Sequence, residues 1–376
     1  MTRKSVCIKT FFRRSPEIMR IAYLCFEDFS VETGVAKKIC LQAGKWQAAG
    51  HEVALFAPRL TAARITAAEE LQIVEFDFAL GAAKYFDPGG MGIREVSRFA
   101  PDIVYNRYFI LPPWHLRLAT EFNLVFEVNS EESEFTLYHS RVKLAFHKLW
   151  KTQYQRSAAG AIFISRELSE KPDFRRFRQR AVIANGIECP QTSPTQFCRK
   201  PGPPRLFFIG DGQLPWHGVD KIGYIARHLP DVHIDVVGVR APDENLPNIR
   251  YHGRLARHSY EPLIRDADVA IGPLSLHTKS LSEASPLKVR EYLASGVPTV
   301  IAYRDTDIPP NTAMTLHIPN TPDNVSTNIA RIASFIHSAR GRRIEWNSVT
   351  SLDATTKEQQ RLDFFTECVV RNRRAA

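Results

Sequence analysis

Two glutamates bracket a stretch of the sequence that is suited to binding an anion. Ser285, which follows Glu283 closely, is a natural N-cap for a helix, and Pro286 fits the first helical position because its missing N–H is not needed there. The start of a helix carries unpaired N–H groups and a partial positive charge, so it can bind a phosphate. Lys288 adds a cation in the first turn.

The two carboxylates are placed to meet different parts of a ligand larger than a phosphate. Glu283 precedes the cap, whereas Glu291 lies about one and a half turns into the expected helix. Gly296 is suited to end that helix, and the apolar residues 297–302 indicate a buried strand. A capped helix followed by a strand is also ordinary in parallel α/β domains, so the alternative for both glutamates is a solvated surface position.

The first half of the sequence alternates between strand and helix patterns. A loop with Gly34 follows the first strand, and a helix pattern over 35–49 leads to the next strand. This βαβ unit places Gly34 at the carboxyl edge of a parallel sheet, where ligands bind in open α/β folds. Strands are expected at 20–26, 51–56, 71–76, 102–106, 124–129, 161–165 and 181–184.

Three polar residues lie at or just past the ends of these strands. Arg107, Glu127 and Asn129 therefore occupy positions where ligand-binding groups are common in parallel sheets. The alternative for each is hydrogen bonding at the surface.

The second half of the sequence repeats the alternation. A strand at 205–209 leads to a loop with Gly210 and Gly212, and further strands are expected at 232–237, 249–252, 269–272 and 297–302. Two Rossmann-like, doubly wound α/β units joined by a linker predict a deep cleft between them. We expect an extension at 1–18, a first domain at 19–190, a linker at 191–204 and a second domain at 205–376. The sequence permits the last helix to cross back to the first domain.

Composition bounds the class of protein. The chain has 376 residues, 44% of them hydrophobic, which is enough for two cores because single cores stop growing near roughly 250–300 residues. No apolar run approaches the roughly 20 residues that span a bilayer, and the basic N-terminus lacks a signal-peptide core, so a cytoplasmic protein is expected. The cysteines are scattered and no Asp-x-Asp pair follows a strand, so neither disulfides nor a metal site is expected.

The net charge of +10 favours polyanionic partners without choosing among them. A helix expected over 133–158 interleaves basic with apolar residues, so it either lies on an anionic membrane surface or covers the sheet with a solvated basic face. These residues include Lys148, Leu149, Trp150 and Arg156. No compact aromatic and basic recognition motif is present, so no nucleic-acid partner is expected.

The stretch around the two glutamates resembles a known signature. Glu-x7-Glu with Pro286 at the fourth position, followed by Tyr-Leu-Ala-Ser-Gly-Val-Pro-Thr-Val at 292–300, resembles the donor site of family 4 retaining glycosyltransferases. Those enzymes have the GT-B fold, in which two Rossmann-like domains face each other across a cleft. The stretch Asn-Gly-Ile-Glu at 185–188 is also similar to the one that closes their first domain.

The resemblance implies roles for the residues already singled out. Glu283 would contact hydroxyls of the transferred sugar, and Glu291 would hold the ribose. Seven further residues would bind the donor at or near its diphosphate: Ser285, Pro286, Leu287, Lys288, Gly34, Gly210 and Gly212. From their positions at strand ends in the first domain, and not from the resemblance, Arg107, Glu127 and Asn129 are expected on the acceptor side.

The sequence departs from the family beside the expected diphosphate. Many members carry Arg and Lys where this chain has Asp211 and His217. His217 would assist catalysis by donating to a phosphate, either as a cation or in the right tautomer. The alternative is that Trp216 and His217 only pack the loop. Lys288 and the helix N–H groups must then carry more of the diphosphate charge than in most relatives.

The expected activity is transfer of a sugar, with retention, from a nucleotide diphosphate sugar to a hydroxyl acceptor. The acceptor would be a glycan, a lipid-linked molecule or a small molecule, and no cofactor or metal is expected. A sugar-nucleotide epimerase or hydrolase of the same fold is one alternative. A catalytically weak homologue that only binds nucleotide sugars is another.

Overall fold

The computed structural model describes residues 18–76, 91–110, 114–134, 141–189, 201–243, 246–310, 312 and 314–375. The expected extension at 1–18, apart from Ile18, and the expected linker at 191–204, up to residue 200, lie outside the described residues.

The first domain is built on a parallel sheet. Within the described residues its strands lie in the order β3-β2-β1-β4-β5-β6-β7, and every neighbouring pair is parallel. The strands are β1 Arg20–Leu24, β2 Glu52–Pro58, β3 Gln72–Phe76, β4 Ile103–Arg107, β5 Leu124–Val128, β6 Gly160–Phe163 and β7 Arg180–Val182. The strand order reverses between β1 and β4, and such a switch point opens a crevice at the carboxyl ends of the strands.

The second domain repeats this construction with the described strand order β10-β9-β8-β11-β13-β15, again parallel throughout. Its strands are β8 Arg205–Ile209, β9 His233–Val237, β10 Ile249–Tyr251, β11 Val269–Ile271, β13 Thr299–Ile301 and β15 Thr315–His317. A separate short pair joins β12 Glu283–Ala284 to β14 Arg304–Asp305. The expected class of two doubly wound α/β units is confirmed.

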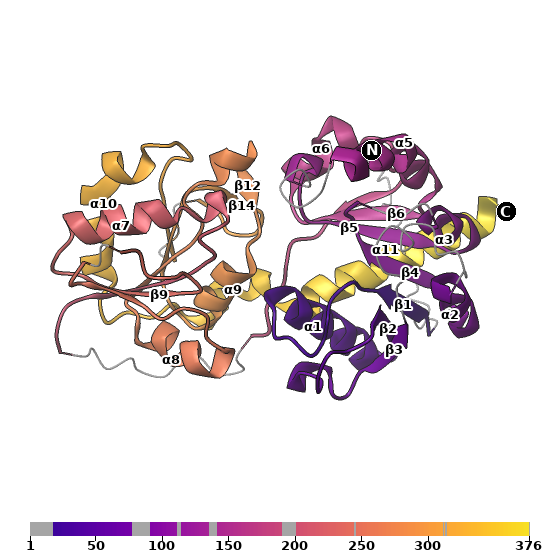
Figure 1. Ribbon diagram of the computed structural model, residues 1–376, viewed down its shortest axis with the longest axis horizontal. Coiled ribbons are helices and arrows are strands. Elements are labelled where there is room, and N and C mark those ends of the chain that lie inside the picture. The colour runs from indigo at the N-terminus through magenta and orange to yellow at the C-terminus, as the bar shows by residue number, and fades with distance from the viewer. Residues whose placement is uncertain are drawn as a thin grey trace, which may run out of the picture.

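Helices cover both faces of each sheet (Figure 1). In the first domain they are α1 Gly34–Ala48, α2 Met91–Phe99, α3 His115–Glu121, α5 Arg141–Ser157 and α6 Arg166–Glu170. In the second they are α7 Val219–His228, α8 Arg257–Asp266, α9 Leu287–Ala294 and α10 Asn324–Ala339. β1 shows why the strands are apolar throughout: Ile21 and Tyr23 enter the core on one face, and Ala22 and Leu24 enter the core on the other.

The last helix, α11 Ala354–Ala375, follows the second domain in sequence but lies along the first (Figure 1). Its Phe365 packs on Trp46 of α1 and Tyr105 of β4, with ring centroids 5.4 and 5.2 Å away. Its Arg361 is fully buried and donates to the carbonyl oxygens of Ile183 and Ala184. The helix therefore completes one face of the first domain's core.

Some elements differ from the sequence expectation. The helix expected over 133–158 is a 3-10 turn at Glu132–Glu134 and the helix α5 from Arg141, with residues 135–140 outside the described part. α2, α6 and β15 were not expected. α6 and β15 are too short to give a clear period, whereas α2 is amphipathic and its pattern was overlooked.

Truncating Phe365 to Ala is predicted to lower the free energy of unfolding by about 3–5 kcal/mol, because the side chain is fully buried among aromatic rings. Urea unfolding followed by circular dichroism measures this. The matched control is Val370→Ala on the same helix, where the side chain is 40% exposed and the expected change is within about 0.5 kcal/mol. Equal effects of the two substitutions would show that α11 does not complete the core.

Candidate active site

A cleft of about 1530 Å³ separates the two domains, and helix starts from both line it. The first domain contributes Gly34 at the start of α1, and the second contributes the loop at Gly210 and the start of α9. Thr33 caps α1, since its hydroxyl accepts the Ala36 N–H at 2.9 Å. A Cβ on Gly34 would lie 3.9 Å from Leu287 Cδ1, so the starts of α1 and α9 face each other across the cleft.

The start of α9 differs from expectation in its cap. Pro286, with extended backbone angles, is the N-cap residue, and no side chain of the described chain caps the helix. The Ser285 hydroxyl instead accepts the backbone N–H of Asn185 at 2.9 Å, and the Asn185 side chain donates to the Ser285 carbonyl oxygen at 2.5 Å. The prediction of Ser285 as the cap was therefore wrong: the residue joins the two domains. Pro286 and the first turn of α9 line the cleft without a protein cap.

Lys288 brings an unpaired cation to this helix start. Its Nζ is buried, makes no hydrogen bond within the described chain and lies 5.3 Å from the centroid of the Phe208 ring. Burial lowers the pKa of Lys288 to about 7, against a weaker opposing effect of the Asp211 carboxylate. A buried ammonium without a partner is unfavourable, so this position is suited to an anion from outside.

His217 is held in one tautomer. Its Nδ1 accepts the Asp211 N–H at 2.8 Å, so in the neutral ring the proton is on Nε2. Burial and the neighbouring Lys288 lower the pKa of His217 to about 3, so the ring is neutral near pH 7. His217 can therefore donate a hydrogen bond from Nε2 but adds no charge. Of the two forms expected from the sequence, the cation and the neutral tautomer, the unliganded protein has the neutral one.

The two glycines of the loop after β8 differ in what they do. A Cβ on Gly210 would lie 2.5 Å from the Phe208 ring and 3.3 Å from His217 Nδ1, so only glycine lets the loop pass there. A Cβ on Gly212 would meet only Val239, at an ordinary 3.7 Å, and Gly212 is not among the residues that line the cleft. The structure thus brings Gly210, but not Gly212, to the candidate site.

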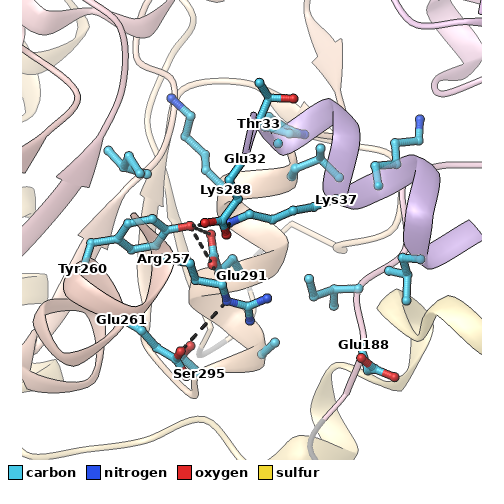
Figure 2. A pocket seen from close by; sticks show the side chains of 18 of the residues that line it. Glu32, Thr33, Lys37, Glu188, Arg257, Tyr260, Glu261, Lys288, Glu291 and Ser295 are labelled. Carbon is cyan, nitrogen blue, oxygen red and sulfur yellow. Dashed lines mark hydrogen bonds and ion pairs between the residues drawn. The ribbon is translucent and has the colours of Figure 1, made fainter. Parts of the chain in front are cut away.

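Glu291 points into the cleft from α9 and is joined to α8 (Figure 2). The Tyr260 hydroxyl lies 3.1 and 3.3 Å from its two carboxylate oxygens, and Arg257 Nε lies 3.5 Å away. Burial raises the pKa of Glu291, against the opposing effects of Arg257 and Lys37. Lys37 of α1 also donates to the Tyr260 hydroxyl at 3.3 Å, so this cluster links the two domains.

Glu283 lies elsewhere, at a contact between the domains. Its carboxylate accepts the backbone N–H of Glu167, at the start of α6, at 2.7 Å. The Glu167 carboxylate in turn accepts the N–H groups of Ser282 and Glu283 at 2.8 and 2.7 Å. Glu283 is absent from the residues that line the cleft, so its expected contact with a sugar stays a prediction.

An inner pocket of about 200 Å³ lies beside the cleft. It shares Lys38, His217 and Lys288 with the cleft, and its wall also includes the three polar residues at the strand ends, Arg107, Glu127 and Asn129. The sequence-predicted acceptor-side residues are thus brought together with Lys288 and His217.

Glu127 is a fully satisfied anion rather than an open ligand group. Its carboxylate accepts from Lys38 at 2.8 Å, from Asn129 at 3.0 Å and from Arg361 at 3.4 Å. Burial alone would raise its pKa, but Lys38 and Arg361 outweigh burial and hold the pKa of Glu127 far below its ordinary value. Burial, partly offset by Glu127, lowers the pKa of Lys38 to about 8. We therefore assign Glu127 a positioning role in the wall.

Within the described residues, no group of three or more His, Cys, Asp or Glu side chains is arranged to hold a metal ion. In that same part of the chain, no helix combines the length and hydropathy needed to cross a membrane.

No protein-family model matches the sequence, and no curated protein is similar to it. Solved structures match nearly the whole chain. Sucrose-phosphate synthase from Thermosynechococcus elongatus aligns with a TM-score of 0.63 at 12% identity, covering 95% of this chain and 98% of its own. HepE from Anabaena, in complex with UDP-glucose, has a TM-score of 0.64 at 15% identity, with coverages of 93% and 100%. The glycosyltransferase WaaG has a TM-score of 0.61 at 14% identity, with coverages of 92% and 99%. The chain has the GT-B fold.

The GT-B cleft contains residues that sequence reasoning did not single out. Arg257, Tyr260 and Lys37 surround Glu291, and their positions depend on how α8 and α1 approach α9. Lys37 and Lys38 closely follow Gly34 in the sequence. Because the Gly34 loop was expected at the site, this position could have indicated cations near the start of α9. Tyr260 and Arg257 had no comparable signal.

The pKa of Lys288 predicts how anion binding in the GT-B cleft depends on pH. Because the lysine loses its charge as pH rises through about 7, the affinity for sulfate, which does not titrate in this range, is expected to fall about tenfold between pH 6 and pH 8.5. His217 is neutral across this range and contributes no slope.

Calorimetry with sulfate measures this dependence. Lys288→Met is expected to bind sulfate weakly and to keep only a smaller decrease, because Lys38 in the same cleft has a pKa of about 8 and also loses charge over this range. A variant that kept the full decrease would show that another group is responsible.

Proposed function

We propose that this chain transfers a sugar from a nucleotide diphosphate sugar to a hydroxyl acceptor, with retention of configuration. The observation that carries the proposal is the uncapped start of α9 beside the buried, unpaired Lys288. Together they offer N–H donors and a positive charge on one wall of a cleft large enough for a nucleotide sugar. The solved HepE structure, which has the same fold, is in complex with UDP-glucose.

The reaction would proceed on one face of the sugar. The acceptor oxygen forms a bond to the anomeric carbon, the bond from that carbon to the diphosphate oxygen breaks, and the acceptor proton passes to the departing diphosphate. The developing negative charge would be stabilised by the α9 N–H groups, Lys288 and the Nε2–H of His217. The α9 N–H groups and Lys288 supply positive charge by themselves, so the proposal includes no metal ion.

The carboxylates would orient the donor. Glu291, which faces the cleft, would accept hydrogen bonds from the ribose hydroxyls. Glu283 would hold hydroxyls of the sugar, which requires that it release the N–H of Glu167. Glu127 would hold Lys38 beside the inner pocket, where the transferred sugar would lie.

Substituting Glu291 by Ala is predicted to weaken binding of a nucleoside diphosphate by about 10- to 100-fold, because hydrogen bonds to a charged group are lost. Calorimetry with UDP, GDP and ADP tests this. Glu261→Ala is the matched control, since Glu261 lines the same cleft but pairs with Arg265.

Removing either carboxylate reduces repulsion of the anionic ligand, so Glu261→Ala should leave affinity unchanged or raise it. The same result for Glu291→Ala would exclude a ribose contact. Product analysis with a bound nucleotide sugar then separates transfer from hydrolysis and epimerisation.

We further propose that α5 rests on the anionic inner surface of a cytoplasmic membrane. Leu149 and Trp150 are 73% and 37% exposed, which is unusual for large apolar side chains. Exposed basic residues flank them on α5. Others lie on the segment just after Asp173, which is held beside α5 because Lys151 and Gln155 donate hydrogen bonds to Asp173. These are Arg141, Lys148, Arg156, Arg175 and Arg176. Apolar side chains among cations match an anionic bilayer surface.

The double substitution Leu149→Ser and Trp150→Ser is predicted to reduce cosedimentation with vesicles of phosphatidylglycerol and phosphatidylcholine at least about fivefold, because apolar insertion is lost while the charge is kept. Val370→Ser is the control, since Val370 is exposed but lies on α11. Binding to these vesicles that is unchanged in the double variant would contradict the proposal.

A further inference from the structure

A third space, here called the side pocket, opens within the first domain beyond the inner pocket. Its volume is about 360 Å³, and it shares Val35, Arg107 and Asn129 with the inner pocket. The inner pocket in turn shares His217 and Lys288 with the cleft. The three spaces are therefore adjacent, in a series from the start of α9 to the carboxyl end of β4 in the first domain.

Asn106 lines the side pocket without a hydrogen-bond partner. It lies on β4, its side chain is 0% exposed, and neither its Oδ1 nor its Nδ2 bonds to any other described residue. Buried amides in native structures nearly always make hydrogen bonds, because an unpaired donor or acceptor keeps the full cost of its lost hydration. The two amide atoms have no accessible surface in this structure, so they can bond a group in the side pocket only when the neighbouring side chains move aside.

The remaining wall favours a ring that is apolar on its face and polar at its edge. Phe26 and Phe109 pack edge to face with ring centroids 4.9 Å apart and line the same pocket. Aromatic walls suit the C–H face of a sugar, while an amide offers one acceptor and one donor side by side to neighbouring hydroxyls.

The charges around the side pocket are mixed. Glu27 and Arg107 line it with opposite signs, and Glu134 is paired with Lys279 at 2.6 Å. A strongly charged ligand would find no excess of the opposite charge on this wall. The side pocket therefore fits a neutral ligand better than a phosphorylated or carboxylated one.

We propose that the side pocket binds the acceptor as a neutral pyranose, with two adjacent hydroxyls bonded to Oδ1 and Nδ2 of Asn106. The role as acceptor rests on the proposed function, and the pyranose specificity is the new element. A third hydroxyl of this ring would then point along the inner pocket toward the anomeric carbon of the donor sugar. Asn106 would determine which acceptors are accepted without contacting the diphosphate.

The test is saturation-transfer NMR on the full chain with methyl glycosides of glucose, galactose, mannose and N-acetylglucosamine, with and without UDP. Asn106→Leu is expected to weaken binding of the preferred glycoside at least about tenfold and to raise Tm, because a hydrocarbon of similar shape needs no hydrogen bonds. Asn248→Leu is the matched control. The Asn248 Nδ2 lies 2.9–3.0 Å from three carbonyl oxygens that share its two N–H groups, so its loss should lower Tm and leave glycoside binding unchanged.

Three outcomes would overturn the inference. These are the absence of binding of every glycoside in both conditions, equal binding by Asn106→Leu, and a fall in Tm of Asn106→Leu as large as that of Asn248→Leu. Nucleotide binding by the wild type is measured separately. Glycoside binding that depends on Asn106, in a chain that binds no nucleotide, would uphold the pocket and reject the glycosyltransferase proposal.

Discussion

The buried carboxylate of Glu127 is the constraint on which the first domain's side of the site depends. An anion at the end of a central strand, 1% exposed, is tolerated only when cations and donors surround it. The chain meets this requirement with Lys38 from α1 and Arg361 from α11, two residues far apart in sequence. By attracting both, Glu127 fixes α1, which begins at Gly34, against α11. The ion pairs that neutralise Glu127 therefore help to determine the position of one wall of the cleft.

The other wall is set by direct bonds between the domains. Arg290 of α9 is fully buried, pairs with Asp305 and donates to the carbonyl oxygen of Asn185. Asn185 also bonds Ser285, just before the helix start. The residue that sequence patterns suggest as a helix cap therefore serves to hold α9 against the first domain. The helix start is left open to the cleft because its nearest hydroxyl is used elsewhere.

The α/β class, the two-domain division and the position of the α9 start follow from sequence because they rest on local signals. Apolar strand patterns, Gly34 and the Ser-Pro helix start are local features, and Lys288 lies where the first turn places it. The bonding of Ser285 and Glu283 did not follow, because each finds a partner in the other domain. Glu127 was expected at the site, but its satisfied ion pairs depend on α11, more than two hundred residues away in the sequence.

The path of α11 has a consequence for how the chain is made. The residues that close the first domain's core, among them Phe365 and Arg361, are synthesised after the whole second domain. Domains usually fold in order as they leave the ribosome. Here the first domain must wait with part of its apolar surface uncovered, and with Glu127 lacking its Arg361 partner, until α11 has been synthesised. Translation that stops before α11 would leave a product with two sheets but an unfinished first core, and thus a substrate for chaperones and proteases.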